Sequence, residues 1–137
     1  MRAEKMKRYL LFLIVLILGV SILWACENSP QEFGILEGHV TIGPLVPVVR
    51  EGEEEPTPAP EVYAAREVVV YKKDGKTEFT RLEIDASGNY QAKLPVGAYV
   101  VDINHLGIYT AKDLPKEIDI TNQGVTRLDI DIDTGIR

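Results

Sequence analysis

The sequence predicts an all-β protein, a single seven-stranded β-sandwich that follows an N-terminal signal helix. Two observations favour this fold class. After residue 26, no stretch of ten or more residues repeats its apolar positions with the 3.6-residue period of a helix. Instead, seven short segments alternate apolar and polar residues or are uniformly apolar, and Gly, Pro, Asn and Asp separate them at short spacing.

The first 25 residues have the features of a secretory signal peptide. An almost unbroken apolar run of about 17 residues extends from Tyr9 to Ala25. Four basic residues precede it: Arg2, Lys5, Lys7 and Arg8. The run is short for a membrane-spanning helix, which needs about 20 residues, and long for a cleaved signal, so an uncleaved signal anchor is the alternative. Both interpretations place the chain after Cys26 outside the cytoplasm, because the basic end stays inside.

The only cysteine, Cys26, lies directly after this apolar run. Leu23, Ala25 and Cys26 resemble the lipobox of a bacterial lipoprotein signal, from which Trp24 departs at the middle position. The resemblance implies cleavage before Cys26 and a covalent diacylglyceryl lipid on its sulfur, with fatty acyl chains such as palmitate. Two or three chains anchor a protein stably, because each buried methylene contributes about 0.8 kcal/mol and one chain binds only marginally.

The expected organisation has three parts: residues 1-25 as signal peptide, 26-33 as polar tether and 34-137 as folded domain. Without the leader the chain keeps 11 basic and 20 acidic residues, a net charge of −9. Such an acidic domain is a poor candidate for binding nucleic acid or anionic lipid, since both are negatively charged. One cysteine allows no intrachain disulfide, so the domain must be held by its hydrophobic core.

The first predicted strand is Gly34–Ile42, with Gly38 as a candidate β-bulge. Prolines in the next stretch exclude a central strand there. The segment Glu51–Glu61 holds five acids and three prolines and is expected to be an exposed, extended loop. It is a candidate partner-binding loop, the alternative being a solvated crossover between two sheets. The candidate residues are Arg50, Glu53, Glu54, Glu55, Pro56 and Pro58.

A buried strand is expected at residues 68–71, and Asp74-Gly75 after it predicts a type I′ hairpin. The hairpin leads to a strand at 78–84. In this strand Thr80, Leu82 and Ile84 are expected to face the core, and Phe79 lies on the opposite face.

A turn is expected at residues 85–89, followed by strands at 90–94 and 98–104. The oxygen-bearing side chains of the turn also suggest a calcium loop. That interpretation fails, because Tyr90 and Val96 occupy the positions where an EF-hand requires Gly and Glu.

The last part of the chain contains a long connection at 105–115, a short strand at 117–121 and a clear alternation at 125–134. One face of the alternation carries three carboxylates: Asp129, Asp131 and Asp133. Clustered carboxylates repel one another unless a cation lies among them, so a weak calcium site is one interpretation. The other is an outward-facing surface balanced by Arg127 or by lysines.

Sixteen side chains are expected to form the core, which is enough for a small sandwich at about 1.5–3 kcal/mol each. They are Ile35, Leu36, Val40, Val68, Val70, Leu82, Ile84, Tyr90, Leu94, Val101, Ile103, Ile118, Ile120, Leu128, Ile130 and Ile132.

The turn pattern of the chain resembles that of carboxypeptidase-regulatory-like domains and of the B-type repeats of bacterial collagen adhesins. The pattern is Leu82-x-Ile84-Asp85-x-x-Gly88-x-Tyr90 and then Leu94-Pro95-x-Gly97-x-Tyr99-x-Val101. The resemblance covers about residues 34–133 and implies a seven-stranded sandwich of the prealbumin (transthyretin) type. The Lys–Asn isopeptide crosslink of the adhesin repeats is not expected, because the first strand has no lysine.

A narrower resemblance, to small bacterial exported domains, rests on the Gly-Pro stretch at 43–50, the Pro-rich loop and the C-terminal Gly-Ile-Arg. Members of that group often carry a bridged pair of cysteines, which the resemblance places at Val46 and near Glu55. This chain lacks the pair, so the segment 43–61 is expected to be looser.

No nucleophile elbow, phosphate loop or zinc helix motif occurs in the sequence. A metal shared by His39 and His105 is a minor alternative, since lone histidines more often only form hydrogen bonds. We therefore expect no enzyme and no cofactor besides the lipid on Cys26. The expected function is a binding or scaffold module for an envelope protein partner, lipid-anchored on the extracytoplasmic side of a bacterial membrane or outer envelope.

The alternative function is a carbohydrate-binding module on the same sandwich. Such modules usually present exposed aromatic rings to the sugar. The candidates are Tyr63, Tyr71, Tyr99 and Tyr109.

Overall fold

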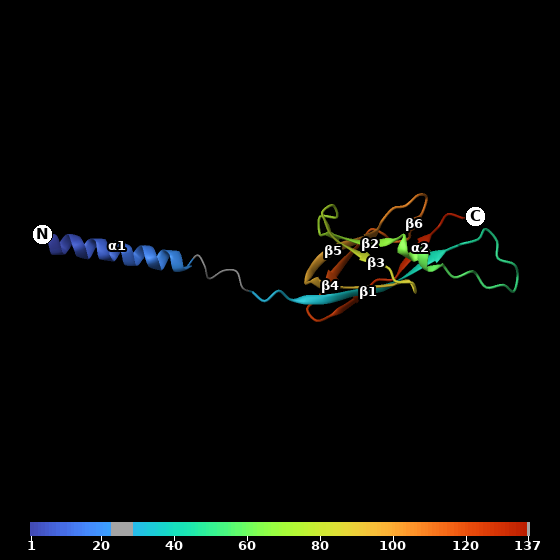
Figure 1. Cartoon of the computed structure of the whole chain (residues 1–137), viewed down its shortest axis with the longest axis horizontal. Helices are drawn as coiled ribbons and strands as arrows, with labels where there is room; N and C mark the ends of the chain where they lie inside the picture. The colour runs from blue at the N-terminus through green and yellow to red at the C-terminus, as the bar shows by residue number, and fades with distance from the viewer. Residues whose placement is uncertain (23–28, 137) are drawn as a thin grey trace. The chain divides into compact units, whose positions relative to one another are not determined.

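The computed structural model describes residues 1–22 and 29–136 (Figure 1). They form two compact units, Met1–Pro30 and Gln31–Arg137. The first unit contains the helix α1 (Arg2–Ile22). Among the described residues, no helix combines the length and the apolar character that crossing a membrane requires. Cys26, and with it the predicted lipidation and cleavage site, lies outside the described residues.

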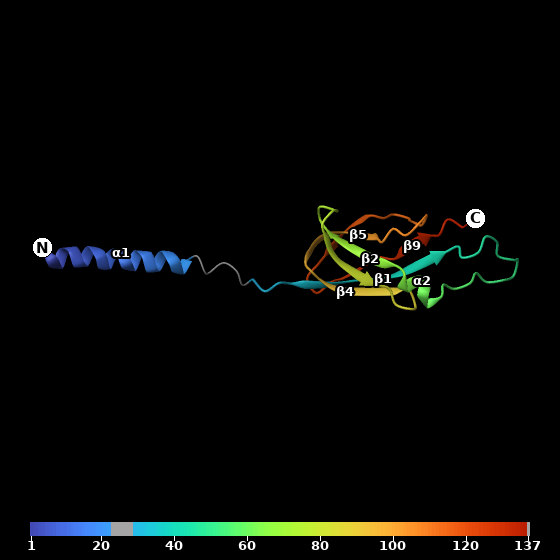
Figure 2. The ribbon, with the colours of Figure 1, turned by 45° about the horizontal axis from the view of Figure 1, so that its top comes forward.

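The second unit consists of two β-sheets with a common core, which confirms the predicted β-sandwich (Figures 1 and 2). One sheet has the order β4-β1-β9-β6, and β8 also pairs with β1. Its strands are β1 (Phe33–Gly43), β4 (Asn89–Pro95), β6 (Thr110–Ala111), β8 (Val125–Arg127) and β9 (Ile130–Asp133). The other sheet has the order β3-β2-β5-β7. Its strands are β2 (Glu67–Lys72), β3 (Glu78–Glu83), β5 (Gly97–Ile103) and β7 (Lys116–Ile120).

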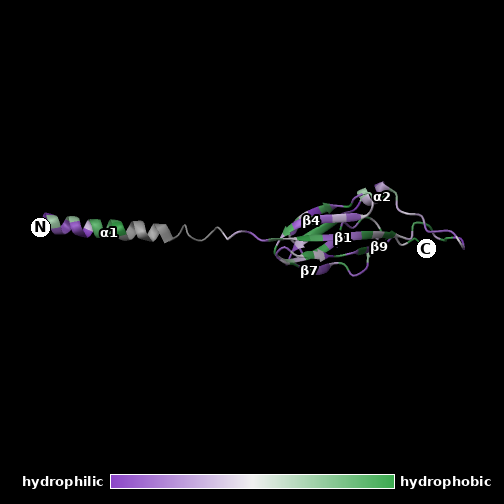
Figure 3. Cartoon of the chain, turned by 90° about the horizontal axis from the view of Figure 1, so that it is seen from below, coloured by the Kyte–Doolittle hydropathy of each residue, from purple (hydrophilic) through white to green (hydrophobic). Residues whose placement is uncertain are grey.

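Strand β1 is the central element of the first sheet. It pairs antiparallel with β4 from Phe33 to His39, and parallel with β8 and then β9 on its other side. Its even-numbered residues are buried and its odd-numbered residues are partly or fully exposed. The strands of the sandwich carry both hydrophobic and hydrophilic residues (Figure 3). Since side chains point to opposite faces in turn, one face of β1 belongs to the core.

Every predicted core residue except Ile35 is buried, and Ile35 is half-buried on the outer face of β1. The alternation of β1 places Ile35 opposite Leu36, so both cannot face the core. The core also includes three residues that the sequence did not indicate as core: Ile42, Tyr63 and Tyr99.

The predicted bulge at Gly38 is wrong. The pairing of β1 with β4 continues without interruption through Gly38 and its partner Tyr90. The glycine is needed for another reason: a Cβ at position 38 would lie 1.8 Å from the carbonyl oxygen of Leu128. Here another backbone segment approaches the strand closely, which is the second reason for a glycine within a strand.

The type I′ hairpin predicted at Asp74-Gly75 is also wrong. Such a turn needs positive φ at both central residues, and here Gly75 has a φ of 65° whereas Asp74 is not among the residues with positive φ. The strands are instead joined by a longer loop, residues 73–77, in which the Asp74 carboxylate accepts the backbone N–H groups of Lys76 and Thr77.

A register shift follows this loop. Val70 pairs with Thr80 but Tyr71 pairs with Glu78, so Phe79 is an extra residue in β3. Its ring lies 5.3 Å from that of Tyr99, and the side chain is still 40% exposed. The alternation predicted for residues 78–84 therefore holds only beyond this bulge.

The segment 125–134, predicted as one strand, is divided into β8 and β9. At the break, the Asp129 carboxylate accepts the N–H of His39 at 2.9 Å, and the N–H of Leu128 donates to the carbonyl of Glu37 at 2.9 Å. The structure also contains two short elements that were not predicted, the strand β6 and the helix α2 (Pro60–Ala64). Helix α2 is too short for a periodic signal, and its first residue is a proline, which favours that position.

Candidate functional site

The sandwich has two ends that differ in their connections. We call the end where β1 begins, at Phe33, the tether end, and the end where β1 stops, at Gly43, the distal end. The strand pairings place three connections at the tether end: 73–77, 95–97 and 121–124. The distal end carries the loop 44–59, the turn 84–88, the connection 104–109 and the C-terminal residues (Figure 1).

The loop 44–59 projects from the distal end and contains the candidate partner-binding residues. It is exposed along most of its length, as expected. Of those six residues, only Pro58 is half-buried. The Glu55 carboxylate accepts the backbone N–H of Leu45 at 3.3 Å, and the side chain of Leu45 packs against the core. A carboxylate therefore joins the two limbs of the loop next to Val46, where the narrower resemblance places a cysteine pair.

Apolar side chains accompany this loop at the distal end. Val48 is 80% exposed, and Ile108, from the connection after β5, is 76% exposed. Val49 and Leu106 are exposed as well. Sequence reasoning missed Leu106 and Ile108 because their segment has no period, although apolar residues beside Gly107 in a polar connection were a usable signal.

A buried cation supports the base of the distal end. Arg66 is 6% exposed, donates to the carbonyl oxygen of Val62 at 2.7 Å and lies 4.3 Å from the centre of the Tyr109 ring. A guanidinium over an aromatic face is favourable when desolvated. Helix α2 and the connection after β5 are thereby fixed to one another, and the loops above them start from a rigid base.

The predicted calcium residues lie along β9 and just before it. Asp129 accepts hydrogen bonds from Arg127 at 3.2 Å and from the His39 backbone N–H at 2.9 Å, and these two bonds, in that order, lower its pKa. Asp133 accepts the N–H of Gly135. Asp131 lies beside a small cavity of about 230 Å³ with Lys112 and Lys116. Within the described ranges, no three His, Cys, Asp or Glu side chains are arranged to hold a metal ion.

The two histidines have different partners. His39 Nδ1 lies 3.0 Å from the side-chain oxygen of Asn89, whereas His105 Nε2 lies 3.1 Å from the Asp102 carboxylate. His39 belongs to the first sheet and His105 follows β5 of the second. A hydrogen bond to a neighbour is the ordinary role of such a residue.

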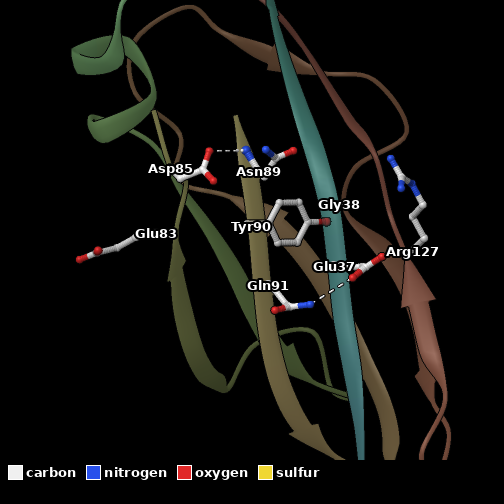
Figure 4. A pocket seen from close by; sticks show the side chains of 8 residues that line it. All are labelled: Glu37, Gly38, Glu83, Asp85, Asn89, Tyr90, Gln91 and Arg127. Carbon is white, nitrogen blue, oxygen red and sulfur yellow. Dashed lines mark hydrogen bonds between the residues drawn. The ribbon is translucent and has the colours of Figure 1, made fainter. Parts of the chain in front are cut away.

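A polar hollow of about 480 Å³ opens beside β4 and the turn before it (Figure 4). Gln91 donates to Glu37 at 3.1 Å across its floor, and Asp85 accepts the backbone N–H groups of Ser87 and Asn89. These hydrogen bonds, that of Asn89 first, lower the pKa of Asp85. The predicted turn at 85–89 is confirmed, with Gly88 at a φ of 85°. The hollow was not predicted, because its lining residues come from strands that are distant in the chain.

The four tyrosines considered for carbohydrate binding do not share one exposed surface among the described residues. Tyr63 and Tyr99 are buried. Tyr109 stacks on Arg66, and Tyr71 is half-buried on the second sheet.

The fold defines the class of protein: a β-sandwich domain preceded by a separate N-terminal segment. The sequence matches no protein-family model and no curated protein. The structure is similar to that of GBS52, the minor pilin of Streptococcus agalactiae, with a TM-score of 0.53 and 18% identity over 75% of this chain and 45% of that chain. A DUF3823 family protein from Parabacteroides merdae gives a TM-score of 0.47 and 14% identity over 74% and 46% of the two chains. The match to the pilin shows the β-sandwich fold, and this chain spans less than half of either solved structure.

Proposed function

We propose that this chain is an exported bacterial lipoprotein, anchored through lipid on Cys26, whose sandwich binds an envelope protein with its distal end and catalyses no reaction. The domain would be of the carboxypeptidase-regulatory-like, prealbumin type and would face the extracytoplasmic side. The signal sequence supports export, and the turn pattern around Gly88 supports the family.

The course of β1 is the observation that carries this proposal. The tether joins the sandwich at Phe33, and the Pro-rich loop leaves it at Gly43. These 11 residues span about 36 Å at about 3.3 Å per residue. A domain anchored near residue 26 therefore carries its loop 44–59 at the end opposite to its attachment, where a partner has access.

The chemistry of the distal end suits a protein partner. Protein interfaces combine an apolar centre with a polar, charged rim. Val48 and Ile108 supply exposed apolar surface, and the glutamates of the loop supply charge. The prolines of the loop restrict its conformations before binding, which lowers the entropy cost of ordering it. A partner with a basic rim would be attracted at long range.

Lipidation is tested by replacing its acceptor. Cells labelled with a radioactive fatty acid should yield a labelled protein from the wild type and no label from Cys26→Ala, because the thioether needs the cysteine sulfur. The variant should keep its leader and migrate as the longer precursor. Equal labelling of both proteins, or label in neither, would contradict the lipid anchor.

Partner binding is tested by site-specific photocrosslinking in living cells. A benzophenone amino acid at Val48, at the distal end, should give discrete crosslinked species in the envelope fraction. The matched control is Val125, a valine that is 59% exposed at the tether end. We expect the Val48 species to be absent there.

The outcomes of this experiment separate the two functions. No crosslinked species at Val48, or identical species at Val48 and Val125, would contradict the scaffold proposal. Binding of the protein to a glycan array, combined with no crosslink at the distal end, would favour the carbohydrate-binding module instead.

A further inference from the structure

Three segments of the chain meet where the Pro-rich loop leaves the sandwich. The Thr134 hydroxyl donates to the carbonyl oxygen of Pro44, and the Thr134 backbone N–H donates to the carbonyl oxygen of Gly43 at 3.1 Å. The next residue, Gly135, lies against the connection after β5, since a Cβ there would be 3.2 Å from the Cδ1 atom of Ile108. The C-terminal residues therefore hold Ile108 beside the base of the loop, at the distal end (Figures 1 and 2).

Largely exposed apolar side chains stand on two of these segments, Val48 on the loop and Ile108 on the connection after β5. Both segments are fixed close by. Leu45, three residues before Val48, packs against the core, and so does Tyr109, the neighbour of Ile108. A partner that covers Val48 and Ile108 therefore has little backbone to order, which lowers the entropy cost of binding.

Negative charge surrounds these apolar side chains. Residues 50–61 contain five glutamates and one arginine, so their net charge is −4. Four of the glutamates are exposed, and no ion pair within the described ranges involves them. They are Glu51, Glu53, Glu54 and Glu61. The carboxylate of the fifth, Glu55, accepts the backbone N–H of Leu45.

The other charged groups of the distal end do not balance these glutamates. Arg66 is buried beneath Tyr109, and His105 lies beside the Asp102 carboxylate. Arg137, outside the described residues, adds one positive charge in the sequence. Around the small cavity on the flank, acids outnumber lysines: Lys112, Lys116, Asp113, Asp129 and Asp131. An excess of negative charge therefore remains.

The tether end has no such excess. Its four lysines lie among five acids. The lysines are Lys72, Lys73, Lys76 and Lys93, and the acids are Glu32, Asp74, Glu78, Glu117 and Asp119. Screening limits the attraction between exposed charges to about 8 Å at physiological ionic strength. An approaching surface thus responds to the charge of the end that it meets, and strong selection by charge is confined to the distal end.

We propose, on the basis of the proposed function, that the envelope partner binds the distal end with a basic face, in which lysines and arginines surround apolar side chains. Val48 and Ile108 enter the apolar centre, and the cations of the partner lie against Glu51, Glu53 and Glu54 at the rim. Rim charges act mainly on the rate of association and on the choice of partner. The same glutamates repel acidic proteins, so they select against competing surfaces as well.

The test extends photocrosslinking at Val48 to variants of the glutamates. The full-length protein, with the benzophenone amino acid at Val48, is titrated onto envelopes isolated from cells that lack it. Glu53→Gln with Glu54→Gln should raise the concentration for half-maximal crosslinking at least about twofold, since each exposed ion pair strengthens binding by a factor of about one to five. Both side chains are exposed, so this variant should fold as the wild type does.

A matched variant and a change of salt control for total charge. Glu117→Gln with Asp119→Asn removes two charges from exposed positions of β7 and should leave the half-maximal concentration unchanged. For the wild type, that concentration should rise between about 0.1 M and about 1 M salt, because the screening length falls from about 10 Å to about 3 Å. Mass spectrometry should place the attachment point in a segment of the partner where lysines and arginines outnumber acids.

The possible outcomes distinguish the basic face from the partner itself. Crosslinked species that attach to a segment without a basic excess would overturn the basic face and leave the envelope partner in place. The same holds for a titration that ignores both salt and the Glu53 and Glu54 substitutions. Equal effects of the two double variants would assign the attraction to total charge and overturn the role of the distal glutamates. No crosslinked species at Val48 in low salt would overturn the basic face and the proposed function together.

Discussion

Gly38→Ala is expected to destabilise the sandwich by about 3–5 kcal/mol, an effect at the upper end for a single methyl group. The added Cβ would lie 1.8 Å from the Leu128 carbonyl oxygen and 2.8 Å from the Tyr90 hydroxyl. The first contact is with backbone, so it is relieved only if β1 separates from the segment between β8 and β9. The measurement is the urea midpoint of unfolding, followed by tyrosine fluorescence.

Gly43→Ala is the matched control for this substitution. Gly43 belongs to the same strand, and its Cβ would meet only the carboxylate of Glu55 at 3.1 Å. A flexible, exposed side chain can move aside, so we expect a change within about 1 kcal/mol, as for an ordinary surface substitution. Equal urea midpoints for Gly38→Ala and the wild type would contradict the expected steric conflict between a side chain at position 38 and the backbone of Leu128.

Tyr90→Phe is expected to cost about 1–3 kcal/mol at neutral pH, the usual penalty for leaving a buried acceptor without its donor. The Tyr90 hydroxyl donates to the carbonyl oxygen of Leu128, beneath the first sheet. The ring itself is 3% exposed, and phenylalanine conserves its packing. Tyr71→Phe, at a half-buried tyrosine of the second sheet, should change the stability by less than about 0.5 kcal/mol.

The same residue gives the stability a pH dependence. Burial, and secondarily the nearby Asp129 carboxylate, raises the pKa of Tyr90 above its ordinary value of 10.0. A raised pKa means that the neutral phenol stabilises the fold below pH 10 and that this contribution decreases as the pH rises above 10. The difference in unfolding free energy between wild type and Tyr90→Phe should therefore shrink above pH 10. A difference that stays constant between pH 8 and pH 11 would contradict this assignment.

The alternation of side chains was sufficient to predict most of the strands and nearly all of the core. In β9, Ile130 and Ile132 alternate with aspartates, and burial of one face leaves a single arrangement. The same rule places Leu82 and Ile84 correctly. The rule does not predict the bulge at Phe79. A bulge depends on how two strands pair, and the alternation of residues within β3 itself shows no interruption.

The candidate site was predictable only in part. The composition of residues 51–61 indicated an exposed loop, because glutamates and prolines cannot bury apolar surface. What the composition could not provide is the placement of that loop at the same end of the sandwich as Ile108. The two segments follow different strands, and only the order and direction of the strands bring them to the same end. The role of Gly38 was also hidden, since the backbone that approaches it is some 90 residues away, at Leu128.

The parallel pairing of β1 with the C-terminal strands has a consequence for the order of folding. A chain is synthesised from its N-terminus, so β1 appears before the other strands. Its neighbours, β4 on one side and β8 and β9 on the other, appear much later, the last of them almost at the end of the chain. Contacts between such distant segments are typical of slow folding, in milliseconds to seconds. The central strand of the sheet is thus the first to emerge and the last to be enclosed, and a chain that stops before residue 125 leaves the edge of β1 that faces β8 and β9 without its hydrogen-bonding partners.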